Sequence, residues 1–278
     1  MMKKYDIKYV GNLETIDLNK TPYLIKNIEA LFSSEIQINE TNYQLDNRSE
    51  VDSFYFNSIQ KDLEIQVYSK NKEELINHLD YVFSNDKSLK KAGRLYVDDW
   101  YVNCYFIKSS PNYFRKFGIF ETVTYTVLIL SNWIKEEKVD FNKNDDVSST
   151  SGLKYPFSYP FSYSALKKER YVNNSHFAPA KAKIIFYGPV KNPKIEIGGY
   201  VYSVSTELLE NERIEINPFD KTVVKITEDG TSIDEMDNRY VKTSVFTEIQ
   251  TGLNLFQQSD KFSCSVTMYY ERGLPEWK

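Results

Sequence analysis

Apolar and polar residues alternate along most of the chain, which is the pattern of β-strands. In the first half, Leu63, Ile65 and Val67 alternate with polar neighbours. Residues 120–130 show a longer alternation, which predicts a central strand. Residues 94–110 are apolar on both faces and predict a hairpin that is buried on two sides.

Residues 71–86 follow the helical period instead. Their apolar positions form a stripe at helical spacing, made of Leu75, Leu79, Val82 and Phe83. Asn71 precedes the stripe, and Glu74 stands three residues later, as in a capping box. We therefore expect one helix that lies across a sheet, with His78 on its solvent-facing side rather than acting as a ligand.

The second half, from Ala178 onward, consists of short strand-like runs. They recur roughly every 8–12 residues with turn residues between them, which is typical of a sandwich or barrel. The chain is thus predicted to be mainly β. We expect an N-terminal β domain with one helix at 1–135, a linker at 136–164 and a C-terminal β-sandwich at 165–278, because residues 136–154 are charged and nearly free of apolar side chains.

The predicted linker ends in an unusual run, YPFSYPFSYS, at 155–164. Each Pro fixes φ and removes a backbone donor, so the run suits an extended segment better than a central strand. Two interpretations are open. The favoured one is a strap whose aromatic residues dock between the two domains, and the other is a ligand for a groove on a partner protein.

Composition supports the β assignment and excludes some functions. Aromatic residues make up 15% of the chain, with 22 Tyr and 17 Phe, and these residues suit strands. The net charge is −4 and no basic stripe is present, which argues against specific nucleic-acid binding. No apolar run reaches about 18 residues, and MMKK precedes no apolar region, so neither a membrane span nor a secretory signal is expected.

The residues that carry chemistry are few and dispersed. Cys104 and Cys264 lie in strand-like stretches and are expected to be buried, reduced thiols rather than a disulfide. His78 and His176 are far apart in sequence, and the spacing of Cys and His fits no zinc motif. The motifs of P-loops, dinucleotide folds, serine hydrolases and zinc proteases are absent from the sequence.

Acidic clusters are the remaining candidates for catalysis. Sandwich-fold glycosidases use a pair of carboxylates, so the four clusters were considered. They are Asp98–Asp99, Glu136–Glu137, Asp145–Asp146, and the group Asp234, Glu235 and Asp237. Each lies in a turn-like or charged stretch, and none offers a calcium-loop spacing. We therefore expect no catalytic, cofactor-binding or metal residues, and no enzyme. The nominal glycosylation site at Asn173 is expected to be only a polar loop.

A series of segments resembles a known family, the distal tail (Dit) proteins of siphophage-type tails, which also occur in prophages and tail-like bacteriocins. The resemblance is carried in order by RLYVDDWYVNCYFIKSS, VTYTVLILSNWIKEE, YPFSYPFSY, NNSHFAPAKAKIIFYGPVKNPKIEI, ERIEINPFDKTV, GLNLF and CSVTMYYERGLPEW. Ser158 and Ser162 stand where the family often has Asp. The segments cover about 180 residues, and the first sixty residues match less well.

The resemblance implies a structural role. Family members form a hexameric ring through the N-terminal domain and carry a galectin-like C-terminal sandwich outside it. The ring connects the tail tube protein to the baseplate hub, tail lysin or fibre, and its opening admits the tape measure protein. It implies assembly in the bacterial host cytoplasm and a final location at the virion tail tip. The alternative is a sandwich of the tail tip that binds carbohydrate or a receptor, although Trp277 is the only tryptophan of the second half.

Overall fold

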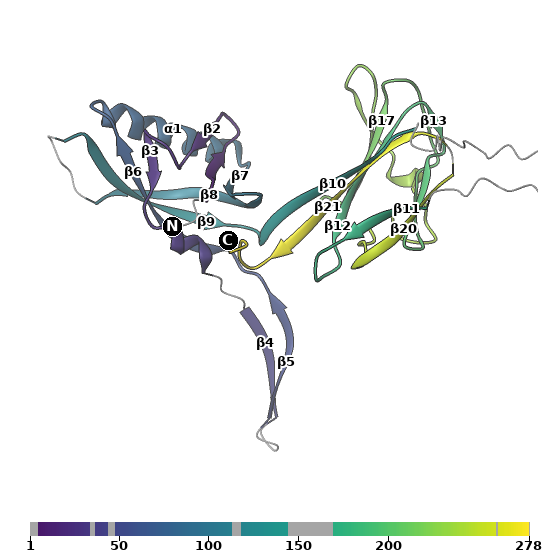
Figure 1. The fold of residues 1–278 in the computed structure, drawn as a ribbon, viewed down its shortest axis with the longest axis horizontal. Coiled ribbons are helices and arrows are strands. Elements are labelled where there is room, and N and C mark those ends of the chain that lie inside the picture. Colours follow the sequence, from purple (N-terminus) through teal and green to yellow (C-terminus); the bar gives the residue numbers. More distant parts are fainter. Residues whose placement is uncertain are drawn as a thin grey trace, which may run out of the picture. The chain divides into compact units, whose positions relative to one another are not determined.

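The chain folds into two compact units. The computed structural model describes residues 5–33, 37–43, 48–112, 118–143, 169–259 and 261–277. The first unit comprises Met1–Lys135 and Glu271–Lys278, and the second comprises Glu136–Tyr270. Both consist mainly of antiparallel strands (Figure 1), which confirms the mainly-β prediction.

The first unit is an antiparallel sheet centred on strand β8. This strand pairs with β7 on one side and with β9 and β10 on the other, and β6 and β3 follow from β9. The strands of the first unit are β1 (Ile7–Val10), β2 (Thr15–Asp17), β3 (Tyr23–Ile25), β4 (Gln37–Tyr43), β5 (Arg48–Tyr55), β6 (Ile59–Tyr68), β7 (Gly93–Val97), β8 (Trp100–Pro111), β9 (Phe120–Ile129) and the start of β10 (Trp133–Phe141), with a 3₁₀ helix η1 (Ile28–Phe32) before β4. Strands β4 and β5 form a small sheet of their own.

The α-helix α1 (Lys72–Leu89) lies on this sheet (Figure 1). Of the predicted apolar stripe, Leu79, Val82 and Phe83 are buried and Leu75 is partly exposed. The ring of Phe83 stacks on Phe106 of β8 at 3.8 Å, and Tyr125 of β9 meets it edge-on at 5.3 Å. These aromatic contacts fix the helix to the sheet. No helix in the described ranges is long and apolar enough to cross a membrane.

The predicted capping box at the start of α1 is wrong. The side chain of Asn71 makes no capping hydrogen bond, and its amide nitrogen lies 3.4 Å from a carboxylate oxygen of Glu74. Asn71 has φ −102° and ψ 49°, outside the extended region that a capping residue requires. The preceding turn holds Asn71 instead, because its backbone N–H donates to Ser69 Oγ at 2.9 Å.

A buried carboxylate joins the last turns of α1 to the turn between β1 and β2. Asp86 is fully buried and accepts hydrogen bonds from the hydroxyl of Tyr9, from the backbone N–H of Asn12 at 2.8 Å and from Asn12 Nδ2 at 2.9 Å. The Tyr9 hydroxyl also fills the space above Gly93, where an added Cβ would lie 2.1 Å from it. Only glycine therefore fits at the start of β7.

The second unit contains two large antiparallel sheets, with strand orders β19–β18–β17–β12–β21–β10 and β11–β20–β14–β15, and a small sheet of β13 and β16. Phe141 of β10 stacks on Phe256 of β20 at 3.7 Å, so the two sheets share a core as a sandwich does. Its elements are β11 (Arg170–Asn174), β12 (Lys181–Tyr187), β13 (Val190–Lys191), β14 (Lys194–Ile197), β15 (Tyr200–Ser203), β16 (Glu207–Leu208), β17 (Arg213–Asn217), β18 (Thr222–Ile226), β19 (Ser232–Asp234), η2 (Met236–Asn238), β20 (Gly252–Gln258) and β21 (Ser263–Arg272). The galectin-like topology of this sandwich stays a prediction.

Residues 136–141 of the predicted linker belong to a strand, because β10 continues to Phe141. Residues 136–138 are exposed positions of this strand, whereas Phe141 is buried, so a charged and exposed stretch of strand resembled a linker in the sequence. Residues 144–168, with the aromatic-Pro run, lie outside the described residues. Their flanks on both sides belong to the second unit.

The end of the chain also departs from the predicted domain 165–278, because residues from Glu271 onward belong to the first unit. The guanidinium of Arg272 lies 5.4 Å above the ring of Trp100, and the ring of Trp277 lies 4.5 Å from that of Phe32. Aromatic contacts of this kind stabilise the packing of the last residues on the first unit. They leave no periodic pattern in the sequence, so the sequence did not predict them.

Three buried tyrosines make the fold sensitive to alkaline pH. Burial raises the pKa of Tyr9, Tyr125 and Tyr202, and the hydrogen bond to Asp86 raises that of Tyr9 further. Because the folded-state pKa lies above the unfolded value of about 10, this stabilisation is complete below that pH and is lost as the pH rises above it. We expect the free energy of unfolding in urea to fall steeply above about pH 10.

Two tyrosine-to-phenylalanine variants isolate this effect. Tyr202→Phe should make the fall with pH shallower, since the buried hydroxyl that resists ionisation is gone. Tyr81→Phe, at a position that is 63% exposed, should leave the profile unchanged. A free energy of unfolding that stays constant from pH 9 to pH 11 would contradict the prediction.

Candidate functional site

The acidic clusters that the structure describes have structural roles or lie on a strand. Asp98 adopts φ 54° in the tight turn between β7 and β8, and its carboxylate accepts the backbone N–H of Asp6 at 3.0 Å. Asp234 accepts the N–H of Met236 at 3.0 Å, and the buried Glu235 accepts from the Thr206 hydroxyl at 3.1 Å. Glu136 and Glu137 lie on β10, and Asp145–Asp146 are outside the described residues. Across the described ranges, no three His, Cys, Asp or Glu residues are grouped as metal ligands.

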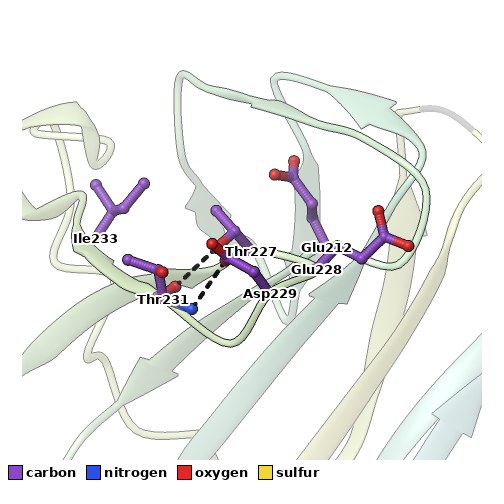
Figure 2. Close-up of a pocket in the computed structure, with 6 residues that line it drawn as sticks. All are labelled: Glu212, Thr227, Glu228, Asp229, Thr231 and Ile233. Atoms are coloured by element: carbon purple, nitrogen blue, oxygen red, sulfur yellow. Dashed lines mark hydrogen bonds between the residues drawn. The ribbon is translucent and has the colours of Figure 1, made fainter.

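A hollow of about 610 Å³ in the second unit is acidic (Figure 2). The Glu212 carboxylate accepts from Lys225 Nζ at 2.8 Å and from the N–H of Leu209 at 2.7 Å, and the Lys225 contact holds its pKa below the usual range. Asp229 accepts the hydroxyl of Thr227 and the N–H of Thr231. Both carboxylates therefore already have partners within the fold, and the hollow lacks the orphaned oxygens of a cation site.

A smaller pocket of about 230 Å³ lies between α1 and strands β8 and β9 of the first unit. Its floor is an ion pair between Lys72 and Glu121, 3.1 Å apart, whose side chains are each 7% exposed. Asp80 and Asn77 of α1 and Ser109 of β8 also line it. The two buried charges already bind each other, so neither needs a ligand. We therefore interpret the pocket as part of the packing between helix and sheet.

The two histidines and the two cysteines do not converge. His78 lies 2.7 Å from Glu14 and 3.2 Å from the Tyr23 hydroxyl, so this half-exposed ring joins α1 to β3 and the β1–β2 turn rather than only facing solvent. His176 stacks on Tyr270 at 5.2 Å. Cys104 and Cys264 are free and buried, as predicted, and burial raises the pKa of both thiols, that of Cys264 to about 12.

The described part of the chain instead offers a hairpin as its most distinctive surface. Strands β4 and β5 pair only with each other, as a separate two-stranded sheet that extends from the first unit (Figure 1). An isolated hairpin of this kind is marginally stable in water unless another surface covers it. This feature is therefore the strongest candidate for a contact with another molecule.

One face of the hairpin is apolar and exposed. Ile38 and Phe54 are directly opposite each other, with exposed fractions of 47% and 70%. A register shift after Asn39 places Val51, which is 44% exposed, opposite Glu40. Because Glu40 lies two residues beyond Ile38, the bulge brings Val51 onto the same face as Ile38 and Phe54.

The hairpin was not predicted from the sequence. Its strands hold only scattered apolar residues between polar ones, and the bulge breaks the strict alternation that predicts a strand. The signal that could have found it is the pair of short stretches 37–43 and 48–55, which contain strand-favouring residues such as Ile38, Val51 and Phe54.

Comparison with known proteins supports the fold. No family model and no curated protein sequence matches the chain. Among solved structures, the SPP1 Dit (gp 19.1) protein, described as a paradigm of the hub adsorption apparatus in phages that infect Gram-positive bacteria, superposes with a TM-score of 0.62 at 10% identity, over 96% of this chain and all of that one.

A chain of the phage P2 baseplate in its activated conformation with Ca matches with a TM-score of 0.64 at 13% identity. The corresponding baseplate with Sr gives a TM-score of 0.62 at 13% identity, and both alignments cover 98% of this chain and all of the other. The resemblance to distal tail proteins inferred from sequence is thus confirmed at the level of the fold.

Proposed function

We propose that the protein is a structural component of a phage tail tip, a distal tail protein that forms a homo-oligomeric ring, with six copies as the family resemblance implies. In this role it connects the tail tube to the baseplate hub, tail lysin or fibre, and the tape measure protein passes its opening. It assembles in the bacterial host cytoplasm and acts in the virion. The role requires no catalysis, cofactor or metal.

The observation that carries this proposal is the β4–β5 hairpin with its uncovered apolar face. A subunit that works alone gains nothing from exposing Ile38, Val51 and Phe54 on a sheet of two strands. A ring subunit needs such an extension, because each copy must bury one of its surfaces on the next. The likeness in fold to SPP1 Dit and to chains of the P2 baseplate supports the same role.

The test is the size and shape of the purified full-length chain. Light scattering coupled to size exclusion, over a wide range of protein concentration, should give a mass of six chains, and negative-stain images should show rings with a central opening. A chain that remains monomeric at every concentration and in the presence of its tail tube or hub protein would contradict the proposal.

The competing function, recognition of carbohydrate or of a receptor, has one surface in its favour. The outer face of β11 and β20 exposes Tyr171 and Leu253, with Asn173 beside them, and an exposed tyrosine near polar groups can stack on a sugar ring. A chain that stays monomeric but binds host cell-wall polysaccharide, and loses that binding in Tyr171→Ala, would favour it over the ring.

A further inference from the structure

Strand β11 leaves an open edge and an uncovered apolar face on the four-stranded sheet of the second unit. It is the last strand of that sheet and, among the described strands, pairs with β20 alone. On the outer face, Tyr171 lies opposite Leu255, and both are exposed together with Leu253 of β20. We call these three residues the β11 face. An open edge beside exposed apolar side chains suits the addition of a further strand.

The opposite face of β11 is already filled. Val172 and Asn174 are buried, and the guanidinium of Arg170 lies 4.9 Å from the ring of Phe256. A strand that joins this edge therefore gains new apolar contacts on the outer side, next to the β11 face, rather than in the core of the sandwich.

The sequence before β11 has the pattern of a strand with one apolar face. In YPFSYPFSY, at 155–163, an aromatic residue occupies every odd-numbered position, and Pro or Ser occupies every even-numbered one. Alternate residues of a strand point to opposite faces, so an extended run would gather all five rings on one face. A polyproline helix has three residues per turn and would distribute the rings around its axis. The spacing therefore favours a strand over a ligand for a partner's groove.

The two prolines of the run fit the same strand. Successive residues of a strand direct their backbone N–H groups to opposite edges. Pro156 and Pro160 are four residues apart, so both lack a donor on the same edge. When that edge faces solvent, no hydrogen bond between strands is lost, and this is the position that proline takes in sheets. The other edge keeps the N–H groups of the aromatic residues, which can pair with β11.

The length of the connection identifies the copy that supplies the strand. Residues 164–169 separate the run from β11, and strands that pair are commonly joined by about 2–6 residues. The Tyr171 hydroxyl donates to the carboxylate of Glu169, so this ring leans toward the connection. A short connection keeps the local concentration of the run at β11 in about the millimolar range, which favours the same chain over a second copy.

We propose that residues 155–163 add to the four-stranded sheet as an edge strand that runs antiparallel to β11 of the same chain. Their aromatic rings extend the β11 face, and both prolines lie on the solvent edge. The run is then a strand of the second unit rather than a strap between domains. It blocks an edge that could otherwise pair with other chains. The inference goes beyond the proposed function and does not depend on the ring.

Hydrogen exchange of the full-length chain, measured by mass spectrometry of peptides, tests the pairing. Alternate N–H groups of β11 point to its free edge, and they should exchange slowly only if a strand pairs with them. Replacing the five aromatic residues of the run by serine should raise the exchange rate of these amides by at least roughly tenfold. Strand β12, in the middle of the other large sheet, should keep its slow exchange and thereby show that the fold is intact.

A variant of identical composition separates the pattern of the run from its aromatic content. Phe157→Ser with Ser158→Phe, combined with Phe161→Ser and Ser162→Phe, keeps both prolines but moves two rings to the opposite face. This variant should also raise the exchange rate of the β11 amides. If it protects β11 as well as the parent chain does, the position of the rings is irrelevant and the added strand is wrong.

Cross-linking tests which face and which copy are involved. Phe161→Cys with Asn173→Cys places two thiols on the same outer face, so a short bis-maleimide should link them within one chain. Ser162→Cys with Asn173→Cys shifts the first thiol by one residue to the opposite face and should give far less product. The native Cys104 and Cys264 do not compete, because both are buried.

Three outcomes would overturn the proposal. Fast exchange of β11 in the parent chain would mean that its edge is open. Equal yields from the two cysteine pairs would mean that the run has no fixed face. Links between chains instead of within one chain would mean that a second copy supplies the strand. Neither test requires assembly, so a chain that forms no ring would contradict the proposed function and leave this inference standing.

Discussion

Replacing Ile38, Val51 and Phe54 together by serine is expected to leave a folded chain that no longer assembles. The three side chains are between 44% and 70% exposed, so the core of the first unit does not depend on them. In an oligomer they would be buried, and truncating such interface anchors commonly costs about 2 kcal/mol or more each. The dissociation constant should therefore rise by a factor of roughly ten thousand or more. Light scattering against concentration measures it.

A matched variant controls for the loss of exposed apolar area as such. Leu209, Val241 and Leu253 of the second unit are 62%, 76% and 71% exposed, and their joint replacement by serine should leave assembly unchanged. The melting temperatures of both triple variants should stay within a few degrees of the parent chain. If the hairpin variant assembles like the parent, the apolar face is not an interface and the observation that carries the proposed function fails.

Replacing Asp86 by alanine is expected to be the most destabilising single substitution in the first unit. The carboxylate is fully buried and receives three hydrogen bonds, from Tyr9 and Asn12. Alanine leaves those donors buried without acceptors and opens a cavity beside α1, and removing one member of a buried charged network costs about 3–5 kcal/mol. Urea denaturation of the full-length chain measures the loss in the free energy of unfolding.

The variant Asp86→Asn separates charge from shape. Its amide oxygen can still accept from two donors, but its nitrogen faces a third donor, so the expected cost is smaller, about 1–3 kcal/mol. The exposed neighbour Lys87→Ala should change stability by less than about 0.5 kcal/mol. Equal stabilities for Asp86→Ala and the parent chain would show that the network does not hold α1 to the β1–β2 turn.

The core of both units could be predicted from sequence because local periodicity encodes it. Leu79, Val82 and Phe83 follow the helical period, and the pair Gly198–Gly199, with φ of 57° and 86°, marks its hairpin by residue type alone. Asp86 could not be predicted, since a carboxylate on a helix resembles a surface residue until the fold brings the Tyr9 hydroxyl to it. Tertiary contacts between distant segments have no local pattern.

The candidate site was harder to predict than the fold for the same reason. The hairpin at 37–55 buries nothing within its own chain, so its sequence lacks the sustained alternation that a core imposes. The first unit ends at Lys135 as predicted, but residues 136–141 were mistaken for a linker because Glu136 and Glu137 occupy exposed strand positions, where charge is tolerated. The hairpin and residues 136–138 of β10 are both exposed to solvent, so their sequences are polar. Composition alone does not distinguish an exposed strand from a linker.

The stacked pair of Phe141 and Phe256 has a consequence for how this chain can vary. The guanidinium of Arg170 lies 4.9 Å from the Phe256 ring and 5.5 Å from that of Phe141, so residues on both sides of segment 144–168 meet at one cluster. Because the cost of closing a loop grows only with the logarithm of its length, a segment with adjoining ends can be lengthened or exchanged cheaply. The stretch between Phe141 and Arg170 is therefore a position where residues could be added at a small cost in free energy and without a change to either sheet.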